Sequence, residues 1–573
     1  MLSTALSTRG LSRHLAFAIG FFMIACCASM SATVGAERSR ERPAPLPRVS
    51  EKDVAEVATE IDRLLSEELF GDATEVAEAT DDVNFLRRVS LDLIGELPSP
   101  ESITAFTLDS SPEKRSRATH GLLENRLFGQ NWARYWRDVI MYRRNDERAL
   151  LASTSLVVYL TKQFNQGAPW DKIARELITA KGNILQEGST GLIAAQWGEV
   201  PDTAAEVSRI LMGIQIQCAQ CHDHPTDRWK REQFHFFAAF FPRIAVRPIR
   251  NTNGMRRGFE LVSRERQRRR PGQGNARKKK KKPKDNTGPE HYMPDLKEPT
   301  ARGTLMEPQF FVTGQTLETG ISDEQRRERL ARWITSRNDP WFAKAFINRI
   351  WAELVGEGFY EPVDDLGPDR ECSAPGAMDL LAEQFVAHAY DVKWLYATIV
   401  QTKAYQRDSK VRRSYEGTPF VANCPQRLRS DQLFNALTTA LDIPEPPASR
   451  RGRVRRGLQG PRAEIARIFG YDPSNPRDEV IGAIDQALML MNSPNLDRGM
   501  RSTKKTVLGR LLREIDDDES IAMELYLRCL AREPEDAELE TCLDYVHEVG
   551  DRNEAFEDIL WALVNSTEFL YRD

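Results

Sequence analysis

The stretch Gln217–Trp229 reads QCAQCHDHPTDRW and contains two of the chain's eight cysteines and two of its eight histidines. Its core is Cys-x-x-Cys-His, the spacing at which c-type haem is attached to proteins. On one helical turn Cys218 and Cys221 lie on the same face, so both thiols can reach the vinyl groups of one porphyrin. The stretch therefore predicts haem thioethers at Cys218 and Cys221 and a proximal iron ligand at His222.

Three other interpretations of these residues remain open. Cys218 and Cys221 can form a disulfide, or they can be free and packed. They can also bind zinc or another metal with His222, and His224 and Asp223 are further candidate ligands. A structural zinc site needs a second ligand pair, which is not obvious in the sequence. An exported location would favour haem, because haem is joined to such motifs outside the cytoplasm.

The N-terminal residues 1–36 have the three parts of a secretory signal peptide. A short basic part is followed by an almost wholly apolar run, 15–28, and small residues at 34–36 supply a cleavage point before Glu37. The apolar run is short for a membrane span, and an uncleaved N-terminal anchor is the alternative. We therefore expect an exported protein of a bacterial periplasm or cell envelope, with no transmembrane span in its mature form.

The composition is typical of a soluble globular protein. The 573 residues are 41% hydrophobic and 29% charged, and the formal net charge is −4. The slight net acidity argues against a general or specific nucleic-acid binder. Removal of residues 1–36 leaves six cysteines, too few in a chain of this length for a disulfide-dense scaffold.

The rest of the sequence predicts a mainly α fold with two helical domains. Apolar residues recur at three- and four-residue steps through 51–245 and again through 324–560. Residues 37–50 form a flexible leader, and 561–573 form the end of the C-terminal helix. Between the domains, 246–323 contain a basic, disordered low-complexity insert and a small β or irregular linker.

Two local patterns have more than one interpretation. The phenylalanine-rich segment 234–241 can wall a flat macrocycle, but its spacing favours a core helix. Asp364 and Asp365 lie in a loop rich in Asp, Pro and Gly, where paired carboxylates can bind a cation. Such residues more often cap a helix or face the solvent.

Several runs resemble known families. They are FLRRVSLDLIG (85–95), QCAQCHDHP (217–225), LARWIT (330–335), NRIW (348–351), EPVDDL (361–366), NSP (492–494) and LVNSTEF (563–569). On these runs, residues 51–245 resemble the planctomycete cytochrome-type domain catalogued as domain of unknown function 1549. Residues 324–560 resemble its usual companion, domain of unknown function 1553. The resemblance implies an exported, mainly helical bacterial protein and supplies no activity.

The first functional hypothesis is an exported c-type haem protein that serves a redox or electron-transfer role with an unknown periplasmic partner. His222 is then the proximal ligand. His224 is badly placed to reach the opposite face of the same iron. The candidates for the sixth ligand are Met212, His235, His291, Met293 and Met306.

Two alternatives do not need haem. A metal-dependent hydrolase of envelope polysaccharide would draw its ligands from Cys218, Cys221, His222, His224, Asp223 and Asp227, with a bound water as nucleophile. A non-catalytic cell-envelope scaffold would use Cys218 and Cys221 as a disulfide. The sequence does not decide whether the chain is an enzyme.

Overall fold

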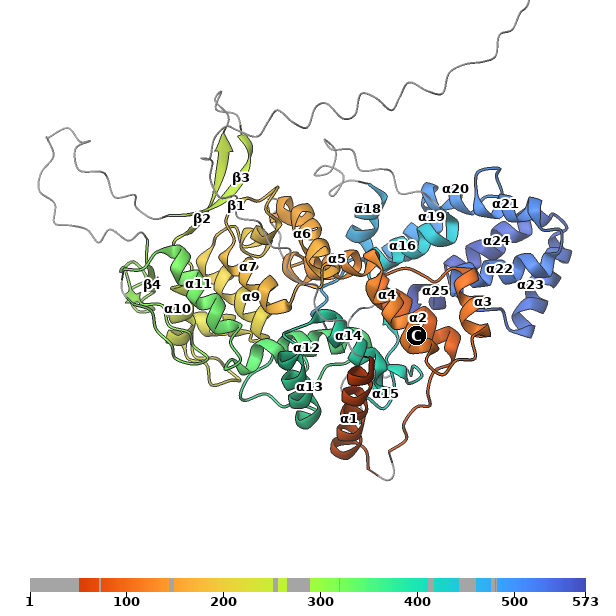
Figure 1. The fold of residues 1–573 in the computed structure, drawn as a ribbon. Helices are drawn as coiled ribbons and strands as arrows, with labels where there is room; N and C mark the ends of the chain where they lie inside the picture. The colour runs from red at the N-terminus through yellow and green to blue at the C-terminus, as the bar shows by residue number, and fades with distance from the viewer. Residues whose placement is uncertain are drawn as a thin grey trace, which may run out of the picture. The chain divides into compact units, whose positions relative to one another are not determined.

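The computed structural model describes residues 51–573 except 72–73, 144–148, 251–255, 265–288, 319, 411–416, 443–459, 476–479 and 481 (Figure 1). The predicted signal peptide, the leader and most of the basic insert lie outside the described residues. In the described part, no helix has the length and apolar character needed to cross a membrane.

The prediction of a mainly α fold is confirmed. The helices before the basic insert are α1 (Glu51–Leu69), α2 (Asp82–Ile94), α3 (Pro100–Leu108), α4 (Lys114–Glu124), α5 (Arg126–Met141), α6 (Ser153–Asn165), α7 (Trp170–Thr179), α8 (Gly191–Ala195), α9 (Val200–Met212) and α10 (Arg231–Ala238). Three short 3-10 turns lie among them: η1 (Ala149–Ala152), η2 (Gly188–Thr190) and η3 (Ile216–Gln220).

The β structure is small and antiparallel. A three-stranded sheet has the order β1-β3-β2, from β1 (Gly182–Asn183), β2 (Ile244–Arg250) and β3 (Arg256–Ser263). After the basic insert, β4 (His291–Met293) pairs with β5 (Thr304–Met306), so that His291 lies opposite Met306. Strands β3, β4 and β5 lie within 246–323, where a small β linker is expected, whereas β1 lies earlier in the chain.

The helices resume at α11, whose start the sequence signals clearly. Ser322 caps the helix by accepting a hydrogen bond from the backbone N–H of Gln325, and the Gln325 side chain returns the bond. The first elements of this part are α11 (Asp323–Ile334), α12 (Pro340–Val355), α13 (Pro375–Ala387), α14 (Val392–Gln401), α15 (Lys403–Gln406), β6 (Gln426–Arg427) and α16 (Ser430–Leu441).

Short helices complete the chain. They are α18 (Pro461–Phe469), α19 (Ile484–Asn492), α20 (Pro494–Met500), α21 (Val507–Glu514), α22 (Asp518–Leu530), α23 (Asp536–Val549), α24 (Arg552–Val564) and α25 (Thr567–Leu570). The last strand, β7 (Tyr571–Arg572), pairs with β6. The residues expected to end a C-terminal helix therefore form the end of α24, then α25 and β7.

Across the described residues, the apolar side chains form two buried cores. One extends through α1–α15 and includes Trp136 and Trp170, whose rings lie 4.5 Å apart, with Phe346 of α12 4.4 Å from Trp170. The other is built by the helices from α16 to α25, together with Leu91 and Leu97. Helices from both halves of the sequence therefore share each core, so the motif is built on a scaffold to which both halves contribute.

Candidate functional site

Helix α9 ends directly before the motif. Gly213 has φ 67°, a left-handed conformation that glycine adopts without a steric penalty, and its N–H bonds to the carbonyl of Arg209 at 3.1 Å. The Ser208 hydroxyl then donates to the carbonyl of Ile214 at 2.8 Å. Because Ile214 and Ile216 are buried, the chain enters the motif at a fixed position.

The first half of the motif forms the 3-10 turn η3, which Cys221 caps. In a 3-10 helix residues three apart are eclipsed, so Cys218 and Cys221 lie on the same side. Both cysteines are exposed and their thiols are free, whereas Ala219 is buried. In this structure no disulfide joins the two cysteines, and their side of the turn faces the solvent.

The exposed side chain of His222 has a defined tautomer. Its Nδ1 lies 2.6 Å from the carbonyl oxygen of Asp223. A carbonyl oxygen only accepts hydrogen bonds, so Nδ1 carries a proton, and in the neutral imidazole Nε2 is then the nitrogen that keeps a lone pair. Metal-binding histidines have this arrangement, in which the second ring nitrogen donates to a backbone carbonyl or a carboxylate.

The neighbouring polar side chains stabilise the loop. Asp223 accepts bonds from the backbone N–H of Arg231 at 3.1 Å and from Lys230 Nζ at 3.0 Å, and these two contacts lower the pKa of Asp223. His224 Nδ1 accepts a bond from the backbone N–H of Thr226 at 3.3 Å. Across the described residues, no three His, Cys, Asp or Glu side chains are grouped so that they can hold a metal ion.

A pair of histidines lies behind the turn. Buried His235 donates from Nε2 to the carbonyl of Gln220 at 3.1 Å, and its Nδ1 lies 2.8 Å from Nε2 of His291. Nδ1 of His235 therefore accepts from His291. Burial and the neighbouring His235 lower the pKa of His291 to about 4. Burial also lowers the pKa of His235. The pair is neutral near pH 7 and fixes the backbone between the two cysteines.

The five candidates for a sixth iron ligand have different surroundings. Both ring nitrogens of His235 are engaged, and Met212 is fully buried in the core. His291, Met293 and Met306 lie on the β4–β5 sheet, and β4 packs against α10. No contact in the described structure assigns a sixth ligand, which stays a prediction.

The core interpretation of the phenylalanine-rich segment is confirmed. Phe234, Phe237, Phe240 and Phe241 are at most 1% exposed. Phe237 packs edge-on against Phe311 at 5.1 Å between ring centroids. These rings pack behind the motif, so they are part of the hydrophobic core that supports the turn.

The comparisons with known proteins identify two families of unknown function. Residues 60–246 match the family described as Protein of unknown function (DUF1549), and residues 326–447 match Protein of unknown function (DUF1553). The chain belongs to both families. Together the two matches cover more than half of the chain. No curated protein and no solved structure matches it.

The DUF1553 region contributes a loop that contacts the motif. The backbone N–H of Leu366 donates to the carbonyl of Gly213 at 2.7 Å, and Arg370 donates to the Thr226 hydroxyl at 2.9 Å. A Cβ added to Gly367 would lie 2.0 Å from Oδ2 of Asp227. Only glycine allows this approach without a shift. Burial is the largest influence on Asp227 and raises the pKa of its carboxyl.

Asp364 joins the DUF1553 loop to the helix that leads into the motif. It is 1% exposed and accepts bonds from Arg209 at 2.7 Å and from Gln215 at 2.8 Å. Burial alone would raise its pKa, but Arg209, Arg349 and Arg143 hold the pKa below its ordinary value. Asp364 is therefore a buried ion-pair residue. Sequence reasoning missed these loop contacts, because the motif and the loop are far apart in the chain.

Proposed function

We propose that the chain is an exported c-type haem protein with a redox or electron-transfer role. Cys218 and Cys221 are the thioether positions, and His222 binds the iron through Nε2. When bound, the haem supplies a one-electron iron couple. The motif residues attach and orient the haem. The buried side chains behind the turn, such as His235, hold the backbone of the motif in place.

The tautomer of His222 carries this proposal. Its Nδ1–H is already bonded to the Asp223 carbonyl, which leaves Nε2 for a metal. On the preceding turn, both thiols are exposed and free, so the vinyl groups of a haem can reach them. The residues present therefore fit the group, and because they are exposed, a haem attached to them would be open to the approach of a partner protein.

The test uses the full chain exported through a host that has a working cytochrome c maturation system. After denaturing electrophoresis, a pyridine haemochrome spectrum is recorded on the protein band. We expect a c-type spectrum that is lost in Cys218→Ser/Cys221→Ser and kept in the control Cys372→Ser. Absence of covalent haem, with a loaded control cytochrome from the same host, would refute the proposal.

Axial ligation and export are tested separately. His222→Ala should change the visible spectrum of the attached haem, whereas His224→Ala should not, because the His224 ring is bonded within the loop. Protein recovered from the periplasm should begin at Glu37, the residue after the expected cleavage point. A periplasmic protein that keeps residues 1–36 would show an anchor in place of a cleaved signal.

A further inference from the structure

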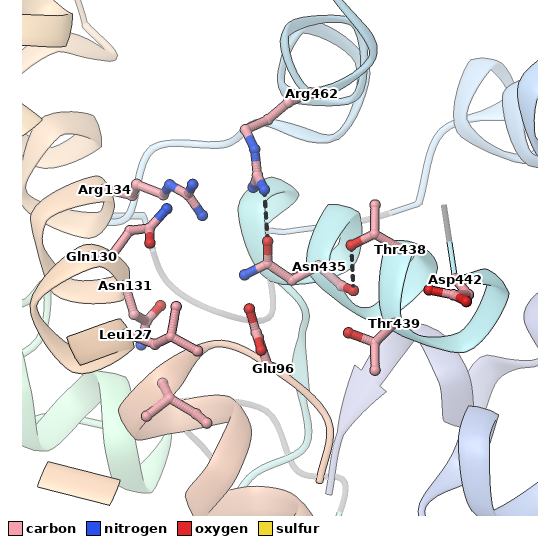
Figure 2. A pocket seen from close by; sticks show the side chains of 11 residues that line it. Glu96, Leu127, Gln130, Asn131, Arg134, Asn435, Thr438, Thr439, Asp442 and Arg462 are labelled. Atoms are coloured by element: carbon pink, nitrogen blue, oxygen red, sulfur yellow. Dashed lines mark hydrogen bonds between the residues drawn. The ribbon is translucent and has the colours of Figure 1, made fainter. Parts of the chain in front are cut away.

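A cavity of about 400 Å³ lies away from the motif, between the end of α2, α5, α16 and α18 (Figure 2). We propose that it is a binding site for a small uncharged polyol of monosaccharide size. The volume is within the range of small-molecule sites. No residue of the Gln217–Trp229 stretch lines it, so the proposal does not depend on haem.

The wall is held rigid by bonds among its own side chains and the backbone. Asn131 donates to the carbonyl of Asp92 at 2.8 Å, and Asn435 donates to the carbonyl of Gly95 at 2.8 Å. Arg462 donates to Oδ1 of Asn435, also at 2.8 Å. These residues lie on helices or at their ends, so the cavity is formed before any ligand binds.

Other polar groups on the wall have unused bonding capacity. Within the described part of the chain, Glu96, Gln130 and Thr439 make no side-chain hydrogen bond. Figure 2 shows these side chains around the same space, with Arg134 beside Gln130. A carboxylate accepts, an amide donates and accepts, and a hydroxyl does both. Neighbouring hydroxyl groups on one ligand can satisfy this mixture.

The charges on the wall indicate an uncharged ligand. The positive groups are Arg134 and Arg462, and the negative groups are Glu96 and Asp442, so the formal charges balance. Burial raises the pKa of Glu96, although Arg134 and Arg462 oppose the rise. Ile94 and Leu127 supply apolar surface, which suits the C–H face of a sugar ring. Neither a strong anion nor a strong cation is favoured.

In the experiment, calorimetry measures the binding of sugars titrated into the full chain. The sugars are the neutral hexoses glucose, mannose and galactose and the charged relatives glucuronate and glucosamine. We expect a neutral hexose to bind with a Kd near or below about 1 mM, and more tightly than either charged relative. Gln130→Leu and Thr439→Val should each weaken this binding about tenfold. Neither side chain is buried, so both variants should fold, which circular dichroism verifies.

The control is Gln186→Leu, the same substitution at an exposed position on a different cavity of the chain. It should leave hexose binding unchanged. Tighter binding of glucuronate or glucosamine would overturn the uncharged class. Absence of hexose binding up to tens of millimolar, or equal binding by all three variants and the parent, would overturn the site.

Discussion

Arg209 and Cys218 lie nine residues apart in the chain but in opposite environments. The Arg209 side chain is buried in ion pairs with Glu206 and Asp364, at 2.6 and 2.7 Å. Cys218 is exposed, and its turn is held through backbone groups such as the Gln220 carbonyl. The two residues therefore have different surroundings. The buried ion pairs of Arg209 with Glu206 and Asp364, here called the buried joint, hold the scaffold together, whereas the turn leaves the Cys218 side chain exposed.

The largest effect should come from removal of the buried joint. Asp364→Ala leaves Arg209 paired with Glu206 but removes the carboxylate beside Arg349, and an uncompensated buried charge costs about 3–5 kcal/mol. Its neighbour Asp365 is paired with Arg370 at 3.1 Å but is partly exposed, so Asp365→Ala should cost less than about 1 kcal/mol. Urea unfolding measures both. Equal costs would contradict the assignment of the joint to Asp364.

A second buried carboxylate, that of Asp339, should have the opposite effect on stability, so that removal of its charge stabilises the protein. Asp339 caps α12 and bonds to the Trp341 N–H, but burial outweighs the opposing effect of the cap bonds and raises its pKa to about 7. A raised folded-state pKa means that stability present below pH 4 is lost as the pH rises through 7. Asp339→Asn keeps the cap and should be more stable by about 2–4 kcal/mol at pH 8.

The control for Asp339 is the pH profile itself. Below pH 4 the carboxyl is protonated in both folded and unfolded chains, so the variant and the parent should unfold at similar urea concentrations. A constant difference between them at all pH values would show that the substitution acts through packing and not through titration.

The helices could be predicted from the sequence, but the contacts around the motif could not. Apolar periodicity and caps such as Ser322 locate the helices, and Cys-x-x-Cys-His locates the turn, because both are local patterns. Periodicity shows which face is buried without showing what covers it. Asp364, in a polar loop, therefore suggested a cap or a cation ligand, and the 155 residues that separate it from Arg209 concealed the ion pair.

Contact between the DUF1553 loop and the motif should give an intermediate effect. Gly367→Ala places a Cβ against Oδ2 of Asp227 and should cost about 1–2 kcal/mol through overpacking. Asp227→Ala removes the clashing atom, so the double variant should recover most of this loss relative to Asp227→Ala alone. Urea unfolding of the four proteins measures the coupling. Strictly additive costs would show that the two residues do not touch.

The smallest effect should be on the stability of the unloaded chain after Cys218→Ser/Cys221→Ser. Both side chains are exposed and unbonded to each other, so the free energy of unfolding should change by no more than about 0.5 kcal/mol. Cys529→Ser is the matched control, because that thiol is fully buried, and a buried hydroxyl without a partner costs about 1–3 kcal/mol. A loss of stability at the motif as large as the loss at Cys529 would mean that the motif cysteines are structural, which would remove the contrast between the turn and the joint.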